Sequence, residues 1–288
     1  ILKKYGADIL RIWVASSNYA EDLRIDYSIL DQHSDSYRKI RNTFRYLLGN
    51  LNDKFEEIDL EKINISQLPE LEQFMLHKIY NLNRNFFKHF NEYDFHNLYK
   101  ELLTFCTVDL SAFYFDIRKD TLYCDSKNSE KRKSTLIVLN VILNSLLKWF
   151  APILSFTTEE VYQLVSRKNK SIHLEKFLIF PQKLENIELN DKWLELIKIR
   201  DVCNISIEEK RASKEIGSSL EASLNIQLDK KGLELLKGID LSEICITSSV
   251  QIAENASKKI HVETKKAKGE KCPVCWKISL EPCKKHSI

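Results

Sequence analysis

A chain of 288 residues of which 43% are hydrophobic can bury a sizeable core, and at the usual domain size it divides into two or three units. Six glycines and five prolines are too few for a many-turned all-β fold or a Gly-rich linker protein, so helix is favoured. The net charge of +3 identifies no class of partner by itself, although residues 258–288 hold nine Lys against three Glu, a local net charge of +6.

The opening stretch, ILKKYGADILRIWVASS, has no initiator Met and reads like the middle of a longer chain, so we expect a fragment. Apolar residues at helical spacing predict a helix from Ser34 that ends with Gly49 as a left-handed cap. One flank of this helix carries Arg38, Arg41 and Arg45. The sequence leaves open whether these three bind RNA or form ion pairs with neighbouring helices.

Three further apolar stripes and a capping motif continue the helical pattern. The second helix begins close to Pro69, the third spans about 95–115, and the fourth ends or bends at Pro152. Thr157 and Glu160 fit the T-x-x-E capping box that begins another helix. Short connections between such helices predict an antiparallel bundle. The aromatic residues expected in its core, rather than against RNA bases, are Phe105, Phe113, Tyr114 and Phe115.

The longest apolar run, 135–156, is interrupted by polar residues and a proline, so we expect a buried helix and no membrane partner. After Pro181 a charged helix from Asp191 to about Lys214 precedes short alternating stretches. These stretches, at 223–228 and 244–246, predict a small α+β unit.

Seven cysteines, an odd number, and no secretory apolar segment make a disulfide framework unexpected and favour a reducing cytoplasm. Four cysteines are isolated, but the last 18 residues, KCPVCWKISLEPCKKHSI, contain C-x2-C and C-x2-H. Two close ligand pairs can surround one tetrahedral zinc ion and leave no open position, which is typical of a structural site. The expected ligands are Cys272, Cys275, Cys283 and His286, with Trp276 covering the site. The alternative is a disordered basic tail in which these residues are unrelated.

No motif for a phosphate loop, a dinucleotide turn or a nucleophile elbow occurs in the sequence. The remaining histidines lack ligand-like or catalytic spacing to Cys or carboxylate partners. By itself, the chain is not predicted to be an enzyme.

Several segments resemble bacterial-type isoleucyl-tRNA synthetases, in the order of that family. YGADILRIWVASSNYAEDLRI is similar to the segment that follows the KMSKS loop, and RNTFRYLLGNL to the first helix of the anticodon-binding domain. DLSAFYFDIRKDTLYC and APILSFTTEEVY resemble two characteristic blocks, while IGSSLEA and the C-x2-C-W resemble the C-terminal unit. The family's metal site generally uses four Cys, whereas His286 stands at the last position here, and neither HIGH nor KMSKS occurs.

The resemblance implies a mainly α fold, in which an antiparallel helical bundle precedes a small α+β unit and a zinc-binding tail. Residues 1–33 would link a catalytic domain to the bundle, 34–185 would form the anticodon-binding domain, 186–262 the α+β unit and 263–288 the tail. The segment would recognise the anticodon region of the tRNA for isoleucine and be inactive alone. Catalytic and editing domains outside this sequence would bind ATP and Mg²⁺ and join isoleucine to the tRNA.

We expect the protein to be a cytoplasmic monomer. The expected tRNA contacts are chosen from the clustering of basic residues. The expected contacts are Arg38, Arg41, Arg45, Lys271, Lys284 and Lys285. Two other functions fit the same residues: a free-standing zinc-containing RNA-binding module without a catalytic partner, and a structural helical scaffold with a disordered tail.

Overall fold

A computed structural model describes residues 1–51, 54–166, 170–255, 259–283 and 285–286. The chain forms two compact units. Unit 1 comprises Ile1–Arg118 and Ser126–Asn186, and unit 2 comprises Lys119–Asp125 and Ile187–Ile288. The division into four segments stays a prediction, although its boundary after residue 262 falls inside a strand, His261–Lys266.

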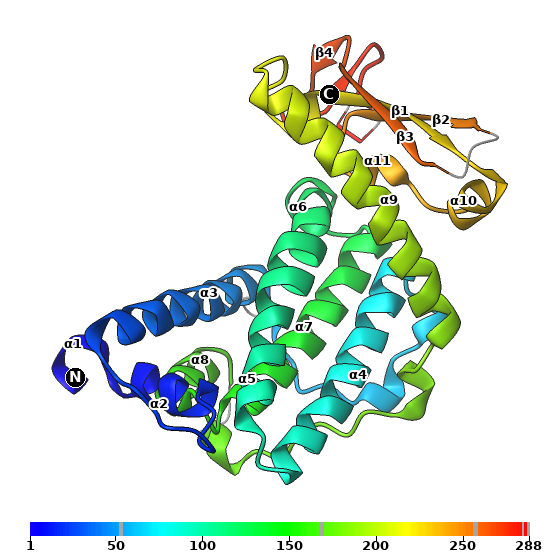
Figure 1. Cartoon of the computed structure of the whole chain (residues 1–288). Coiled ribbons are helices and arrows are strands. Elements are labelled where there is room, and N and C mark those ends of the chain that lie inside the picture. Colours follow the sequence, from blue (N-terminus) through cyan, green and yellow to red (C-terminus); the bar gives the residue numbers. More distant parts are fainter. Residues whose placement is uncertain (52–53, 167–169, 256–258, 284, 287–288) are drawn as a thin grey trace. The chain divides into compact units, whose positions relative to one another are not determined.

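Unit 1 is built from helices (Figure 1). Their bounds are α1 (Leu2–Tyr5), α2 (Ala7–Ser16), α3 (Tyr27–Leu51), α4 (Glu70–Asn91), α5 (Phe95–Thr104), a π-helical segment (Phe105–Tyr114), α6 (Phe115–Cys124), α7 (Glu130–Phe150) and α8 (Ser155–Val165). The last residues of α6 belong to unit 2. The helical bundle predicted from the apolar stripes is therefore confirmed.

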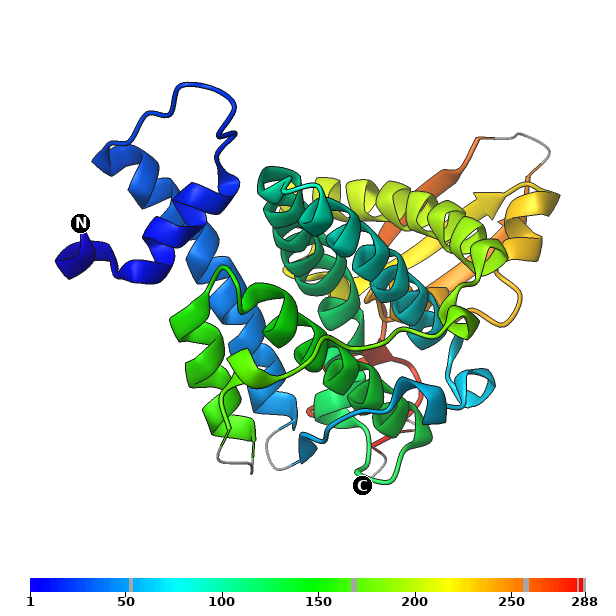
Figure 2. The same cartoon turned by 90° about the horizontal axis from the view of Figure 1, so that it is seen from below.

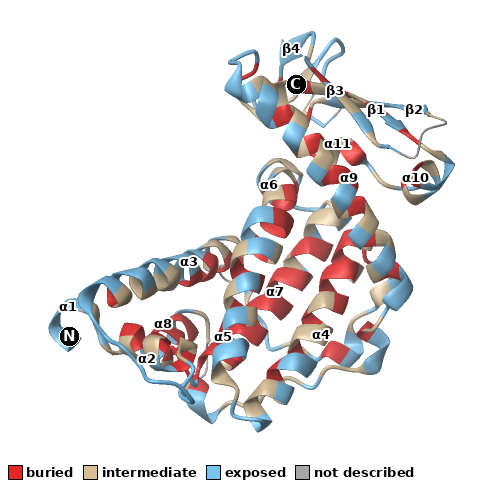
Figure 3. Ribbon diagram, viewed as in Figure 1, coloured by how far each residue is buried: buried red, intermediate tan, exposed pale blue. Residues whose placement is uncertain are grey.

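Helix α7 supplies much of the core of unit 1. Long buried stretches lie on α7 and α4 (Figure 3). Two polar residues of α7 are buried because their amides have partners: Asn140 and Asn144 donate to the carbonyl of Glu56 at 3.0 and 3.1 Å. The apolar run is thus a core helix, as predicted. No helix in the described part of the chain has both the length and the apolar surface that a bilayer crossing requires.

Two predicted helix ends are wrong. Helix α3 begins at Tyr27, before the predicted Ser34, because the Asp26 carboxylate accepts the amide of Ile29 at 2.9 Å and caps the first turn. Gly49 does not cap α3, which continues to Leu51 without a left-handed residue at position 49.

The third predicted helix does not end near residue 115. It continues through the π-helical segment into α6, and all four aromatic residues predicted for the core are buried. A buried carboxylate of α4 connects this helix to its neighbours: Glu72 Oε1 accepts hydrogen bonds from Tyr114 (3.1 Å) and from Thr135 of α7 (3.1 Å). The Arg118 guanidinium contacts both oxygens of the same carboxylate, at 2.7 and 2.6 Å.

The predicted capping box at Thr157 and Glu160 is also wrong. Helix α8 begins at Ser155, before Thr157. Asp8 of α2 caps this helix instead, because its carboxylate accepts the amides of Phe156 (3.3 Å) and Thr157 (2.8 Å). The Thr157 hydroxyl donates to Asp8 at 2.6 Å. Glu160 lies 3.4 Å from Arg41. A carboxylate distant in sequence therefore takes the place of the local cap.

Unit 2 contains a small sheet and one long helix (Figures 1 and 2). Its elements are α9 (Ile187–Ala212), β1 (Ala222–Leu228), α10 (Lys230–Leu235), α11 (Leu241–Ile244), β2 (Ser249–Glu254), β3 (His261–Lys266), β4 (Glu270–Lys271) and β5 (Ile278–Ser279). Strand β1 is central, parallel to β2 and antiparallel to β3. Alternate residues of β1 are buried, and α9 packs against β3, where Ser206 and Thr264 hydroxyls lie 2.7 Å apart.

The α+β prediction is confirmed for the strand expected at 223–228 and wrong for the one at 244–246. Helix α11 ends at Ile244, and Ile246 adopts a left-handed conformation with φ of 55°. A left-handed residue cannot continue an extended strand. The second strand comes later, as β2.

Candidate metal centre and basic surfaces

A two-stranded ribbon presents the first ligand pair. Strands β4 and β5 pair antiparallel, and the loop between them turns tightly because the Trp276 amide donates to the Cys272 carbonyl at 3.0 Å. Gly269 enters this ribbon with φ of +121°, and a Cβ there would lie 2.1 Å from the Ser279 carbonyl oxygen. Only glycine fits such a close backbone approach. The Ile278 amide donates to Ser248 Oγ at 2.7 Å, which ties the ribbon to the rest of unit 2.

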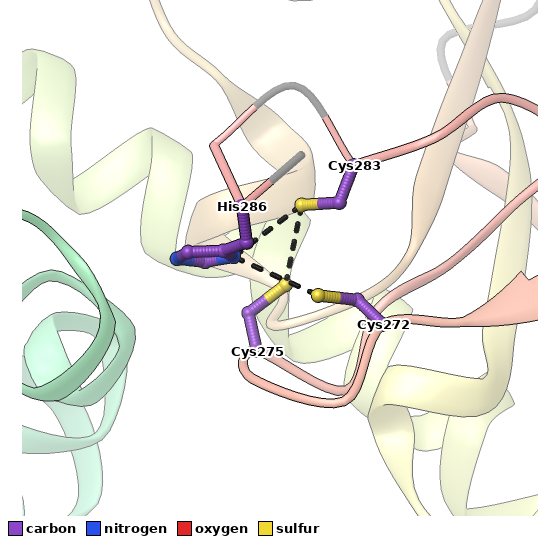
Figure 4. A group of neighbouring side chains, drawn as sticks. All are labelled: Cys272, Cys275, Cys283 and His286. Carbon is purple, nitrogen blue, oxygen red and sulfur yellow. Dashed lines mark hydrogen bonds between the residues drawn. The ribbon is translucent and has the colours of Figure 1, made fainter. Parts of the chain in front are cut away.

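The four predicted ligands converge on one point (Figure 4). Their ligand atoms all lie within 4.8 Å of one another. The sulfurs of Cys275 and Cys283 are 3.8 Å apart, and Nδ1 of His286 lies 3.7 Å from the Cys272 sulfur and 3.4 Å from that of Cys283. Cys272 and Cys275 are buried. The cluster could hold one metal ion.

The two thiols of the first ligand pair differ in their electrostatic surroundings. Backbone amides of Cys275 and Val274 point at the Cys272 sulfur and lower its pKa to about 6. Burial raises the pKa of Cys275 to about 12. Amide donors stabilise a thiolate, whereas burial opposes it unless a cation is close by. The backbone amides therefore favour the thiolate of Cys272, whereas the thiolate of Cys275 would need a nearby positive charge.

Residues at the end of α6 and just after it contact His286 and its neighbour Lys285, and sequence reasoning missed them. His286 Nε2 lies 2.9 Å from the carbonyl of Cys124, which raises the imidazole pKa. The ammonium of Lys285 lies 3.0 Å from Asp120 and 2.9 Å from Asp125. More than 150 residues separate these partners, and no spacing motif connects them.

Trp276, which we expected to cover the site, directly follows Cys275 and is itself exposed. Its side chain is 59% exposed, with φ of 64°. The ammonium of Lys271 lies 5.5 Å from the centre of the indole ring. The ribbon therefore displays an exposed aromatic face beside a positive charge.

The predicted arginine contacts lie on the exposed flank of α3. Arg38 forms an exposed ion pair with Asp35 at 3.2 Å. Arg41 contacts Tyr37 at 3.0 Å and Glu160 at 3.4 Å, so ion pairing with a neighbouring helix, one of the two interpretations left open, does occur. Arg45 is exposed. These arginines and the lysines near the metal ligands lie in different units, and Lys284 is outside the described residues.

Comparison with known proteins assigns a family. A family model described as "Anticodon-binding domain of tRNA ligase" matches residues 72–226, more than half of the chain. The chain belongs to this family. The match begins inside α4 and extends into β1, so it does not coincide with the segment 34–185 that the sequence predicted.

Relatives along the whole chain are isoleucine–tRNA ligases. The protein from Pelagibacter ubique is 69% identical over 287 residues, which are 100% of this chain and 32% of that protein. Those from Agrobacterium fabrum and Bartonella quintana are each 40% identical over 98% of this chain and 30% of theirs. The chain thus spans about a third of the length of these relatives. A crystal structure of an Agrobacterium radiobacter K84 LeuRS–tRNA–LeuAMS complex has a TM-score of 0.49 at 10% identity, covering 90% of this chain and 29% of that one.

Proposed function

We propose that this chain is the C-terminal, tRNA-recognising part of an isoleucine–tRNA ligase. The observation that carries this proposal is the identity of 69% to such a ligase over 100% of the chain. The membership in the anticodon-binding family supports a role in holding the anticodon region of the tRNA for isoleucine. Catalytic and editing domains, which would bind ATP and Mg²⁺, would lie outside this sequence and complete the cytoplasmic, monomeric enzyme.

The metal in the cluster would be a single structural zinc ion. Tetrahedral zinc with Zn–S bonds of about 2.3 Å separates two sulfurs by about 3.8 Å. The Cys275 and Cys283 sulfurs are 3.8 Å apart, which fits this geometry. Three sulfurs and one imidazole nitrogen complete four ligands and leave no position for a substrate. The ion would supply the positive charge that converts the buried thiols to thiolates.

Two exposed surfaces are suited to RNA. The flank of α3 carries Arg38, Arg41 and Arg45, whose guanidinium groups can neutralise phosphates. The ribbon carries Trp276 with Lys271 beside it, a pairing suited to an unstacked base whose phosphate needs a counter-charge. Lys284 and Lys285 remain proposed contacts, although two carboxylates already hold the ammonium of Lys285.

Binding of unmodified tRNA transcripts by the chain tests this proposal. The chain should bind the tRNA for isoleucine more tightly than the tRNA for valine, and replacing the anticodon of the isoleucine tRNA should remove the preference. In parallel, isoleucine-dependent pyrophosphate exchange with the chain alone should stay at the protein-free background, because the HIGH and KMSKS residues of the adenylate site are absent from the sequence. Equal affinity for all tRNAs would favour a general RNA-binding module instead.

A further inference from the structure

The metal ligand His286 contacts a helix end as well as the cluster. Its Nδ1 faces the sulfurs of Cys272 and Cys283, at 3.7 and 3.4 Å, while Nε2 lies 2.9 Å from the carbonyl oxygen of Cys124. Cys124 is the last residue of α6, so this carbonyl is among the four that no helical amide can reach. The imidazole is therefore placed to satisfy a helix end from outside the helix.

Lys285 acts on the same helix end by charge. Asp120 and Asp125 put two carboxylates at the C-terminal turn of α6, where the helix dipole already disfavours negative charge. The Lys285 ammonium lies 3.0 and 2.9 Å from them, and the Asp125 side chain is only 11% exposed. Burial lowers the pKa of Lys285, but hydrogen bonds to Asp125 and Asp120 outweigh it and raise the pKa overall. The cation thus offsets the repulsion at this end.

A third contact joins the segment of the first ligand pair to Cys124. The Cys124 thiol lies 3.7 Å from the carbonyl of Val274, which stands between Cys272 and Cys275. All of these residues belong to unit 2. The segment of the first ligand pair and the segment of the second therefore both contact Cys124, in the final turn of α6.

We propose that His286 and Lys285 form a metal-dependent C-terminal cap on helix α6. The inference rests on the metal site of the proposed function. Coordination through Nδ1 leaves the only imidazole proton on Nε2, where it can donate to the Cys124 carbonyl. A cysteine in place of His286 could coordinate the metal but would have no second polar atom to donate. His286 is thus a positioning residue for α6, and Lys285 is its electrostatic partner.

Amide hydrogen exchange of the 288-residue chain, with metal content measured on the same samples, tests the cap. With zinc bound, the amides of residues 121–125 should be protected, and chelation should speed their exchange by roughly two- to tenfold, the effect of one net hydrogen bond. Exchange within α4 should not change. His286→Cys should keep one metal per chain yet exchange at 121–125 faster than the unchanged zinc-loaded protein. Lys285→Met should keep the metal and exchange at an intermediate rate, whereas the matched control Lys268→Met, at an exposed lysine, should resemble the unchanged protein.

The outcomes separate the cap from the metal site itself. Absence of metal from the unchanged chain contradicts the proposed metal site. Metal present with no protection of residues 121–125, or full protection in His286→Cys, overturns the cap. If His286→Cys loses its metal, NMR of the His286 imidazole in the cadmium-loaded chain decides: coupling of the metal to Nδ1 with a slowly exchanging Nε2 proton supports the cap, and metal on Nε2 overturns it.

Discussion

A buried ion pair joins Glu72 of α4 to Arg118 of α6 within unit 1. The side chains of Glu72 and Arg118 are 0% and 3% exposed, and the guanidinium contacts both carboxylate oxygens. Tyr114 and Thr135 donate to the same carboxylate. A buried charge with this many partners is tolerated, but the same charge without its counter-ion is costly.

Replacement of Arg118 with Met should therefore lower the free energy of unfolding by about 3–5 kcal/mol, because Glu72 would remain buried without its counter-ion. The exposed pair of Arg38 with Asp35 supplies the control, since Arg38→Met should change stability by about 1 kcal/mol or less. Urea unfolding followed by circular dichroism measures both. A loss in Arg118→Met no larger than in the control would show that the buried pair contributes little.

The members of the Cys/His cluster could be predicted from the sequence and their surroundings could not. Cys272 and Cys275 are close neighbours, as are Cys283 and His286, so short spacing reveals both pairs. His286 and Cys124 are in contact although 162 residues separate them, so no local sequence pattern reveals this contact. The same limit applies to the arginines of α3, where only the structure identifies Glu160 as a partner of Arg41.

At the scale of elements, helix α2 fixes the corner between α7 and α8 with two charges. Asp8 accepts the first amides of α8, and the Arg11 guanidinium donates to the carbonyls of Ile153 (2.8 Å) and Pro152 (2.5 Å) just after α7. An anion at a helix N-terminus and a cation at a helix C-terminus are both favourable. One turn of α2 therefore satisfies backbone groups of α8 and of the connection between α7 and α8.

Asp8→Ala should destabilise the chain by about 0.5–2 kcal/mol, the range found when a helix loses its N-terminal cap. Asp8→Asn keeps an oxygen that can accept an amide and should lose less. Chemical denaturation of the two variants beside the unchanged chain makes the comparison. Equal losses would mean that the charge or packing of Asp8, and not its capping bond, stabilises this corner.

The helices themselves were predictable because each buries an apolar stripe, which the sequence displays at helical spacing. Their ends were less so. Asp26 caps α3 from within the same stretch of sequence, whereas Asp8 caps α8 from a position 149 residues away. The third predicted helix continues beyond residue 115, where Glu72 accepts hydrogen bonds from both sides of that position. The donors are Tyr114 of the π-helical segment and Arg118 of α6.

At the scale of the whole molecule, the C-terminal segment differs from the rest of the chain in how much apolar surface it buries. Unit 1 has an extensive apolar core, as the hydrophobic content predicted. In contrast, among the described residues from 265 to 286, only Cys272 and Cys275 are buried. A segment with so little buried apolar surface would depend on the proposed metal for its folding free energy.

Metal removal should therefore unfold the tail and leave the bundle intact. The chain should contain about one zinc ion, and Cys272→Ser or Cys275→Ser should release it. Limited proteolysis should then cut within 265–286, while the helical circular dichroism signal changes little. Cys106→Ser, which alters a buried cysteine in the π-helical segment outside the cluster, controls for general loss of thiols. Stoichiometric zinc in both ligand variants would contradict the site.

RNA binding by the whole chain should weaken steeply with salt, because each neutralised phosphate releases counterions. The logarithm of affinity falls by about 0.7–0.9 per phosphate contact for each tenfold rise in salt. If Arg38, Arg41 and Arg45 each neutralise a phosphate, changing all three to Ala should reduce the salt slope by about 2–3. The matched control removes the same charge from Lys230, Lys231 and Lys237, which are exposed around α10. Binding of the isoleucine tRNA is measured at several salt concentrations. An equal reduction in both triple variants would mean that net charge alone governs the effect, and an unchanged slope in the arginine variant would remove the α3 flank from the RNA-binding surface.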